Sequence, residues 1–223
     1  MKIAIIGAGN IGGALTHRLT ALGHDVTVAN SRGPQTLAEL AEETGASTAT
    51  REDAPRGAEL VIVTIPQRHI LDLPRDLLDQ AAADVVVIDT GNYYPQQRDG
   101  RIDAIEDGTT ESEWVAQQLR HPVIKVFNNI YAQHLLEQGL PKGQPGRIAL
   151  PVAGDDASAK AVVLALVEEL GFDAVDAGPL SESWRQQPGS PVYGTDFDAD
   201  GVKRALDQAS RERPSDFSAS ADA

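Results

Sequence analysis

The residues best suited to chemistry lie near the N-terminus, in the stretch Gly7-Ala8-Gly9-Asn10-Ile11-Gly12. This stretch follows an apolar run and opens a segment with helical spacing. Here the first glycine permits a tight turn, the second lets the backbone approach a pyrophosphate, and the third lets helix and strand pack closely. The helix N-terminus offers free N–H groups to the anion. Glycines that serve loop geometry alone are the weaker interpretation, because strand and helix both flank the stretch. The pattern predicts a dinucleotide site made of Gly7, Ala8, Gly9, Asn10, Ile11 and Gly12.

The residues that end the second apolar run, Asn30-Ser31-Arg32, indicate which dinucleotide would bind. An NAD site normally has Asp or Glu at this place, where the carboxylate holds the ribose hydroxyls. Here no carboxylate is present to repel a 2′-phosphate. Ser31 can donate a hydrogen bond, and Arg32 can pair with the phosphate and stack on adenine, although a solvated loop arginine is the alternative. Asn30, Ser31 and Arg32 therefore predict NADP(H).

Further candidates follow other apolar runs, because ligands of parallel α/β sheets bind outside the carboxyl ends of the strands. Thr64-Ile65-Pro66 is either a cofactor contact or an ordinary turn, and His69 either touches the cofactor or only caps the cleft. Asn128 can orient a carboxamide or stabilise the following turn. The predicted cofactor site therefore also includes Thr64, Ile65, Pro66, His69, Thr90, Asn92 and Asn128.

The elements that must position these residues alternate between short apolar runs and segments with helical spacing. Continuous hydrophobicity is typical of strands covered on both faces. The predicted strands are 3–6, 26–29, 60–65, 85–88, 123–127 and 148–153, and apolar helical stripes run over 11–22, 37–41 and 162–170. Repeated strand–helix units predict the α/β class, with a Rossmann-type, doubly wound, mostly parallel sheet and a small C-terminal extension.

The domain organisation follows from where this alternation stops. Residues 1–180 form the predicted NADP-binding Rossmann domain with its sheet extension. Residues 181–210 are predicted to be an arm packed on the body, because Trp184 and Tyr193 carry large buriable area, with a short helix near 200–209. Residues 211–223 are polar and rich in Ser, Ala and Asp, which predicts a disordered tail.

Composition excludes several function classes. Lys and Arg number 19 against 33 Asp and Glu, and the net charge of −14 disfavours nucleic acid and anionic lipid surfaces. Cysteine is absent, which removes thiol chemistry and Cys-ligated metals, and the five histidines lack metal-ligand spacing. No apolar run approaches the roughly 20 residues that span a bilayer, so we expect a cytoplasmic protein without a metal. No acid–base pair stands out, so no catalytic residue is assigned.

The motifs together resemble the NADPH:F420 oxidoreductase family and the related reductase domain of the STEAP ferric reductases. The resembling segments run from Met1 to about Ser183, and the most specific is Asp176-Ala177-Gly178-Pro179-Leu180-Ser181. The resemblance implies that residues 8–11 line the pyrophosphate and that Ser31 and Arg32 hold the 2′-phosphate. It also implies that Ile65 and His69 lie along the nicotinamide, that the deazaflavin F420 docks there, and that the protein is a homodimer.

Two segments depart from that family, residues 89–95 and the arm residues 184–193. Tyr93 and Tyr94 stack on a flat ring or form an aromatic lid without a ligand. Because F420 is a polyanion and the protein is acidic, F420 would need local cations. The candidates by loop position are Arg68, Arg98, Arg101 and Arg147.

These observations predict an NADPH-dependent oxidoreductase that transfers a hydride between NADPH and a planar redox acceptor, either F420 or a flavin such as FMN. The lack of an assigned acid or base is compatible with this, since the cofactors supply the reactivity. The alternative is a sensor or regulatory protein that binds NADPH without turnover. A reductase of imines or β-hydroxyacids ranks third, because the chain after Leu180 is too short for the long helical domain of those enzymes.

Overall fold

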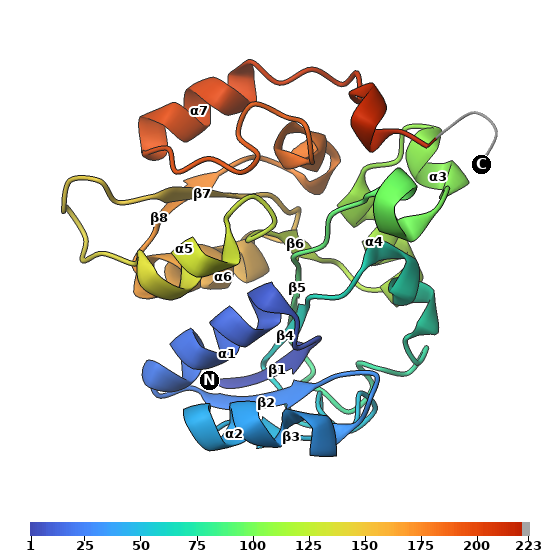
Figure 1. Ribbon diagram of the computed structural model, residues 1–223, viewed down its shortest axis with the longest axis vertical. Coiled ribbons are helices and arrows are strands. Elements are labelled where there is room, and N and C mark those ends of the chain that lie inside the picture. The colour runs from blue at the N-terminus through green and yellow to red at the C-terminus, as the bar shows by residue number, and fades with distance from the viewer. Residues whose placement is uncertain (220–223) are drawn as a thin grey trace.

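The computed structural model describes residues 1–219, which form an α/β protein built on a six-stranded parallel sheet (Figure 1). Its strands are β1 (Lys2–Ile6), β2 (Asp25–Ala29), β3 (Ser47–Thr48), β4 (Leu60–Val63), β5 (Val86–Asp89) and β6 (Ile124–Lys125). The strand order is β3-β2-β1-β4-β5-β6, the order of a doubly wound Rossmann sheet. The pairing places Ile6 beside both Ala29 and Val63, so the carboxyl ends of the central strands meet at one edge.

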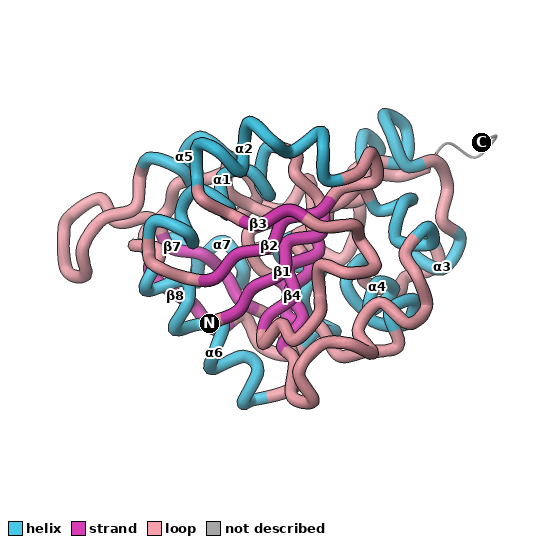
Figure 2. Tube along the Cα trace, turned by 90° about the horizontal axis from the view of Figure 1, so that it is seen from below, coloured by secondary structure: helices cyan, strands magenta, loops and turns pink. Residues whose placement is uncertain are grey.

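Seven α-helices lie among the described residues, and Figure 2 shows strands at the centre with helices around them. They are α1 (Asn10–Ala21), α2 (Ala38–Thr44), α3 (Asp103–Glu106), α4 (Glu111–Leu119), α5 (Ala132–Glu137), α6 (Ala157–Glu169) and α7 (Ala199–Asp207). Helix α4 begins at a capping box of Thr110 and Glu113, and α6 begins at Asp156, whose carboxylate accepts two backbone N–H bonds. These caps satisfy N–H groups that a helix start leaves unpaired.

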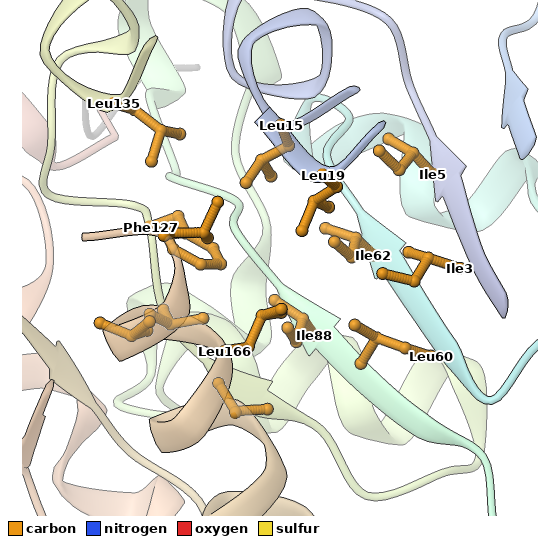
Figure 3. Close-up of a cluster of buried hydrophobic side chains, with 14 of the residues drawn as sticks. Ile3, Ile5, Leu15, Leu19, Leu60, Ile62, Ile88, Phe127, Leu135 and Leu166 are labelled. Atoms are coloured by element: carbon orange, nitrogen blue, oxygen red, sulfur yellow. The ribbon is translucent and has the colours of Figure 1, made fainter. Parts of the chain in front are cut away.

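Both faces of the sheet are covered, as continuous apolar strands require. Alternate residues of each strand belong to different cores because strand side chains point in turn to opposite faces. One core contains Ile3, Ile5, Leu60 and Ile62 with Leu15 and Leu19 of α1 and Leu166 of α6 (Figure 3). The other contains Ala4, Ile6, Val61 and Val63 with Trp114 and Val115 of α4.

The second half departs from the predicted strands in two ways. Strand β6 stops at Lys125, short of the predicted 123–127, because Phe127 has a φ of 64°, which a strand does not accommodate. The predicted strand at 148–153 is β7 (Ala149–Val152), which pairs in parallel with β8 (Asp173–Asp176) in a separate two-stranded sheet. An antiparallel bridge between Lys125 and Ala153 links the two sheets. The sequence patterns had predicted neither β3 nor β8.

The C-terminal arm packs on this second sheet through α7, while its 3₁₀ helix, Leu180–Gln186, packs against α4 and β6. Residues 211–219, which composition predicts to be disordered, also pack on the body, and we call them the C-terminal strap. Gln96 Nε2 donates to the carbonyl oxygens of Ser215 and Ser218 at 2.8 and 2.9 Å. The rest of the predicted tail, residues 220–223, lies outside the described residues.

None of the helices within residues 1–219 combines the length and the apolar character needed to cross a membrane.

Candidate functional site

A cavity of about 470 Å³ opens at the carboxyl ends of β1, β2 and β4, and we call it the nucleotide crevice. It is lined by Ile6, Gly7, Ala8, Gly9, Asn30, Ser31, Arg32, Arg51, Thr64, Ile65, Pro66, His69 and Asp72. The structure thus brings together, from three separate strand ends, most of the residues predicted for a dinucleotide. The volume lies within the range of small-molecule sites.

The glycine turn has the shape that a pyrophosphate needs. A Cβ atom on Gly7, whose φ is +116°, would overlap the carbonyl oxygen of Thr64, and one on Gly12 would overlap that of Gly7. A Cβ atom on Gly9 would meet nothing within 4 Å, so open space lies over that position. Helix α1 begins after Gly9 without a side-chain cap, so its first N–H groups stay available for an anion. The turn therefore fits the phosphates of a dinucleotide.

Two guanidinium groups gather at the end of the crevice next to β2. Asn30 shapes this corner, because its side chain accepts from the backbone N–H of Arg32 and donates to Thr36 Oγ1, both at 2.9 Å. Ser31 and Arg32 are exposed beside it. Arg51, which sequence reasoning missed, lines the same cavity from the segment after β3. A cationic corner of this kind suits a ribose phosphate.

The opposite end of the crevice is formed by the segment after β4. Thr64, Ile65, Pro66 and His69 all line the cavity. That Ile65 and His69 lie along the nicotinamide stays a prediction. His69 is oriented on both sides, since Nδ1 lies 2.7 Å from Asp72 Oδ2 and Nε2 accepts from Arg68 Nε at 3.2 Å. This network places the ring proton on Nδ1.

Several predicted residues lie outside the cavity lining. Asn10, Ile11 and Gly12 form the first turn of α1, behind the glycine turn. Thr90 is buried, and its Oγ1 donates to the carbonyl of Val63 at 3.3 Å. Contact of these residues with a cofactor stays a prediction.

Asn92 and Asn128 are also outside that lining, because their amides bond each other and the arm. Asn92 Nδ2 donates to Asn128 O at 2.9 Å, and Asn128 Nδ2 donates to Asn92 Oδ1 at 3.1 Å. Gln186 Nε2 donates to Asn128 Oδ1 at 3.1 Å, and Asn128 Nδ2 donates back to Gln186 O at 2.6 Å. The chain of amides ties the ends of β5 and β6 to the arm.

The two neighbouring tyrosines after β5 have different environments. Tyr93 is fully buried, its hydroxyl accepts from Ile102 N at 2.9 Å, and burial raises its pKa to about 12. Tyr94 is half-buried, and its hydroxyl forms a hydrogen bond with that of Tyr193 from the arm. Burial raises the pKa of Tyr193 as well. Asn92, Tyr94 and Tyr193 are hereafter the tyrosine site.

Three carboxylates, each at most 1% exposed, hold the backbone of the loop 91–94. Asp89 accepts from Gly91 N at 2.8 Å, Glu111 from Tyr93 N at 3.1 Å, and Asp99 from Tyr94 N at 2.8 Å. Each carboxylate has its own cation: Lys125 lies 3.1 Å from Asp89, Arg213 of the strap 2.8 Å from Glu111, and Arg98 2.9 Å from Asp99. Burial raises the pKa of Glu111 despite the cations near it.

The four candidate cations for a polyanionic acceptor lie in three different environments. Arg68 and Arg98 lie together beside the tyrosine site, where Arg68 Nη1 donates to Arg98 O at 2.5 Å. Arg101 pairs with Asp103. Arg147 is buried in ion pairs with Glu168 and Asp173 and lines another cavity, with Arg18 and Lys142, so it is not part of this site.

The strand order, glycine turn and crevice define a Rossmann-type protein of the dinucleotide-binding class. The family model described as NADP oxidoreductase, coenzyme F420-dependent matches residues 2–93. The chain belongs to this family, which confirms the predicted family, and the six-stranded parallel sheet confirms the predicted fold class. The matched region contains the glycine turn and the whole lining of the nucleotide crevice, and it ends before Tyr94.

The chain is similar to proteins of several bacteria. YjhV of Escherichia coli K12 is 46% identical over 72 residues, which are 32% of this chain and 53% of YjhV, about half of that relative. A hypothetical protein from Sinorhizobium meliloti has a solved structure with a TM-score of 0.75 and 30% identity, covering 88% of this chain and 95% of that one. A protein of Arthrobacter sp. FB24, provisionally assigned as an F420-dependent NADP reductase, has a TM-score of 0.68 and 25% identity over 82% and 87% of the two chains.

An imine reductase from Pseudomonas sp. shares the fold alone. Its TM-score is 0.56 with 17% identity, and the alignment covers 79% of this chain but 55% of that enzyme.

Proposed function

We propose that the protein binds NADPH in the nucleotide crevice and transfers a hydride between this cofactor and a planar acceptor, either F420 or a flavin such as FMN. The observation that carries the proposal is the crevice itself: a glycine turn with open space over Gly9, and a part of the lining formed by Ser31, Arg32 and Arg51. The family supports an oxidoreductase, and its name supports F420 as the acceptor.

Bound NADPH supplies the hydride, and the residues of the chain bind and orient it. The N–H groups after Gly9 hold the pyrophosphate, and the guanidinium groups of Arg32 and Arg51 hold the 2′-phosphate. At the other end Thr64, Ile65 and His69 set the position of the nicotinamide. Such positioning lowers a barrier chiefly by converting a bimolecular encounter into a reaction of bound partners.

The 2′-phosphate assignment is tested with Arg32→Ala and Arg51→Ala, measuring NADPH and NADH binding by calorimetry. A charge-assisted bond contributes about 1.5–3 kcal/mol, so each variant should weaken NADPH binding by about 10-fold to 100-fold. NADH binding should change by less than about threefold, because NADH lacks the phosphate. Equal losses for the two cofactors would show that the arginines do not contact the 2′-phosphate.

Turnover distinguishes this enzyme from a sensor that only binds NADPH. The protein is mixed with NADPH and either F420 or FMN, and NADPH oxidation is followed by its near-ultraviolet absorbance. Oxidation with either acceptor supports the proposal and identifies the acceptor. Tight NADPH binding with no oxidation in both mixtures would favour the sensor. That the protein is a cytoplasmic homodimer stays a prediction.

A further inference from the structure

The tyrosine site lies beside the nicotinamide end of the nucleotide crevice. Thr90 N donates to Val63 O at 3.1 Å, which places the start of the 90–94 loop next to Thr64 in the crevice lining. One carboxylate also joins the two segments, since Asp99 accepts from Arg68 N at 3.2 Å and from Tyr94 N at 2.8 Å. His69, which lines the crevice, directly follows Arg68. A planar molecule over the nicotinamide would therefore meet the loop that carries Tyr94.

The hydroxyl pair has one hydrogen more than it uses. Two phenols carry two hydroxyl hydrogens, and the bond between Tyr94 and Tyr193 uses one of them. The amide of Asn92 has a fixed orientation, because it donates to and accepts from Asn128. Its Nδ2 lies 3.5 Å from the oxygen of Tyr193, which accepts from it, while either hydroxyl can donate in the bond between Tyr193 and Tyr94. Within residues 1–219, the hydroxyl of Tyr94 has no other hydrogen-bond partner, so when Tyr193 donates, the hydrogen of Tyr94 is available to a ligand.

The ring that carries this hydrogen is held in place from several sides. The guanidinium of Arg98 lies 5.1 Å from the centre of the Tyr94 ring, and the ring of Phe217 lies 6.1 Å away. Beneath it, three buried carboxylates hold successive parts of the loop backbone. Buried charges of this kind are costly to desolvate and add little to stability compared with apolar residues. A binding site that positions a hydrogen-bond donor before its ligand binds needs rigid support for that donor. The half-buried hydroxyl of Tyr94 has such support.

We propose that Tyr94 donates this hydrogen to a ring carbonyl of the acceptor, and that Tyr193 and Asn92 are positioning residues that direct it. The inference rests on the proposed function and narrows the substrate to a planar conjugated ring with a carbonyl oxygen, such as the pyrimidinedione ring of F420 or FMN. In the reaction the acceptor receives from NADPH a hydride, which is one hydrogen with two electrons. The acceptor then takes one proton from solvent, and NADP⁺ is left. Tyr94 keeps its own proton and stabilises the negative charge that develops on the carbonyl oxygen.

The test is Tyr94→Phe, which removes one oxygen atom and keeps the ring. With the acceptor that turns over, F420 or FMN, kcat/KM for the acceptor should fall by about 100-fold, the lower end of the loss for one donor to a developing oxyanion. The dissociation constant for NADPH should stay within about twofold, because Tyr94 does not line the nucleotide crevice. Tyr193→Phe should have a smaller effect, about threefold to 10-fold, since Tyr94 then keeps its donor but loses its orientation.

Tyr131→Phe is the matched control, because it removes the same atom from a tyrosine that is 58% exposed. A second readout is direct binding, with the fluorescence anisotropy of F420 or FMN measured as it is titrated onto the protein loaded with NADP⁺. Tyr94→Phe should weaken this binding, and Tyr131→Phe should not.

The outcomes separate this inference from the proposed function. A Tyr94→Phe variant with unchanged acceptor kcat/KM, or unchanged anisotropy titrations where turnover is absent, would overturn the role of Tyr94 alone. Loss of NADPH binding in the wild-type protein would overturn the proposed function instead. Thermal unfolding of each variant confirms that it is folded at the assay temperature.

Discussion

The nucleotide crevice and the tyrosine site lie at the same edge of the sheet but are built in different ways. The crevice depends on backbone shape over short stretches of sequence, with Gly7 and Gly12 permitting a close approach that a Cβ would prevent. The tyrosine site depends on side chains that are far apart in the chain, such as Glu111 and Arg213. The comparison shows that a crevice formed by short local stretches of sequence can lie beside a site that is assembled from long-range contacts.

The largest effect is expected from a substitution that removes support from the tyrosine site and leaves the nucleotide crevice unchanged. Arg213→Met leaves the fully buried Glu111 without its strap cation. Removing one partner of a buried pair typically costs about 3–5 kcal/mol, so we expect a loss of that order in the free energy of unfolding by urea. The double variant Glu111→Gln/Arg213→Met should recover most of it. A loss below about 1 kcal/mol would show that the pair is solvated rather than buried.

The same variant has a pH signature. Burial raises the pKa of Glu111 above its ordinary value of 4.5, so the folded protein binds this proton more tightly than the unfolded chain does. The stability from this group is full below the ordinary pKa and is lost as pH rises through the raised pKa. Arg213 lowers that pKa, so Arg213→Met should lose more stability than the wild type between mildly acidic and neutral pH. The measurement is the free energy of unfolding by urea at several pH values in that range. An equal change of this free energy with pH in both proteins would contradict the prediction.

The next prediction concerns two glycines of the crevice, one needed for packing and one needed for space around the ligand. Gly12→Ala puts a Cβ against the carbonyl oxygen of Gly7, and overpacking of this kind costs about 1–3 kcal/mol. Gly9→Ala meets nothing in the protein, so its free energy of unfolding should change by less than about 0.5 kcal/mol. It should still weaken NADPH binding by about 10-fold, because its methyl group takes the space of the pyrophosphate. Unchanged NADPH affinity in Gly9→Ala would place the phosphates elsewhere.

The smallest predicted effect tests the hydrogen bonds that join the C-terminal arm to the sheet. Gln186→Met removes the donor to Asn128 Oδ1 and should cost about 1 kcal/mol, near the lower end for a buried polar group, because Gln186 Oε1 itself has no partner within residues 1–219. Acceptor kcat/KM should fall with it while NADPH affinity stays constant, since Gln186 does not line the crevice. If NADPH affinity fell together with acceptor kcat/KM, the nucleotide crevice and the tyrosine site would depend on each other structurally.

Local patterns in the sequence are sufficient for five of the six strands of the main sheet, all but β3, and for most of the crevice. A glycine at each required place, Asn30-Ser31-Arg32 after the second strand, and continuous apolar runs each report on their own neighbourhood. Arg51 escaped notice because nothing local distinguishes a loop arginine that faces a cavity from one in solvent. The same reason explains the strap, since polar composition predicts disorder where Arg213 has a buried partner 102 positions earlier in the chain.

The strap also sets an order in time. A chain leaves the ribosome from its N-terminus, so the glycine turn and the strands around it emerge long before residue 213. Until Arg213 emerges, the carboxylate of Glu111 lacks its ion-pair partner. The backbone N–H of Tyr93 then donates to a carboxylate whose charge this arginine does not yet neutralise. Products of interrupted translation that end before the strap should therefore retain the nucleotide crevice yet lack the full support of the loop 91–94. Completion of the C-terminal strap, residues 211–219, is therefore the step that finishes the backbone support of the loop 91–94.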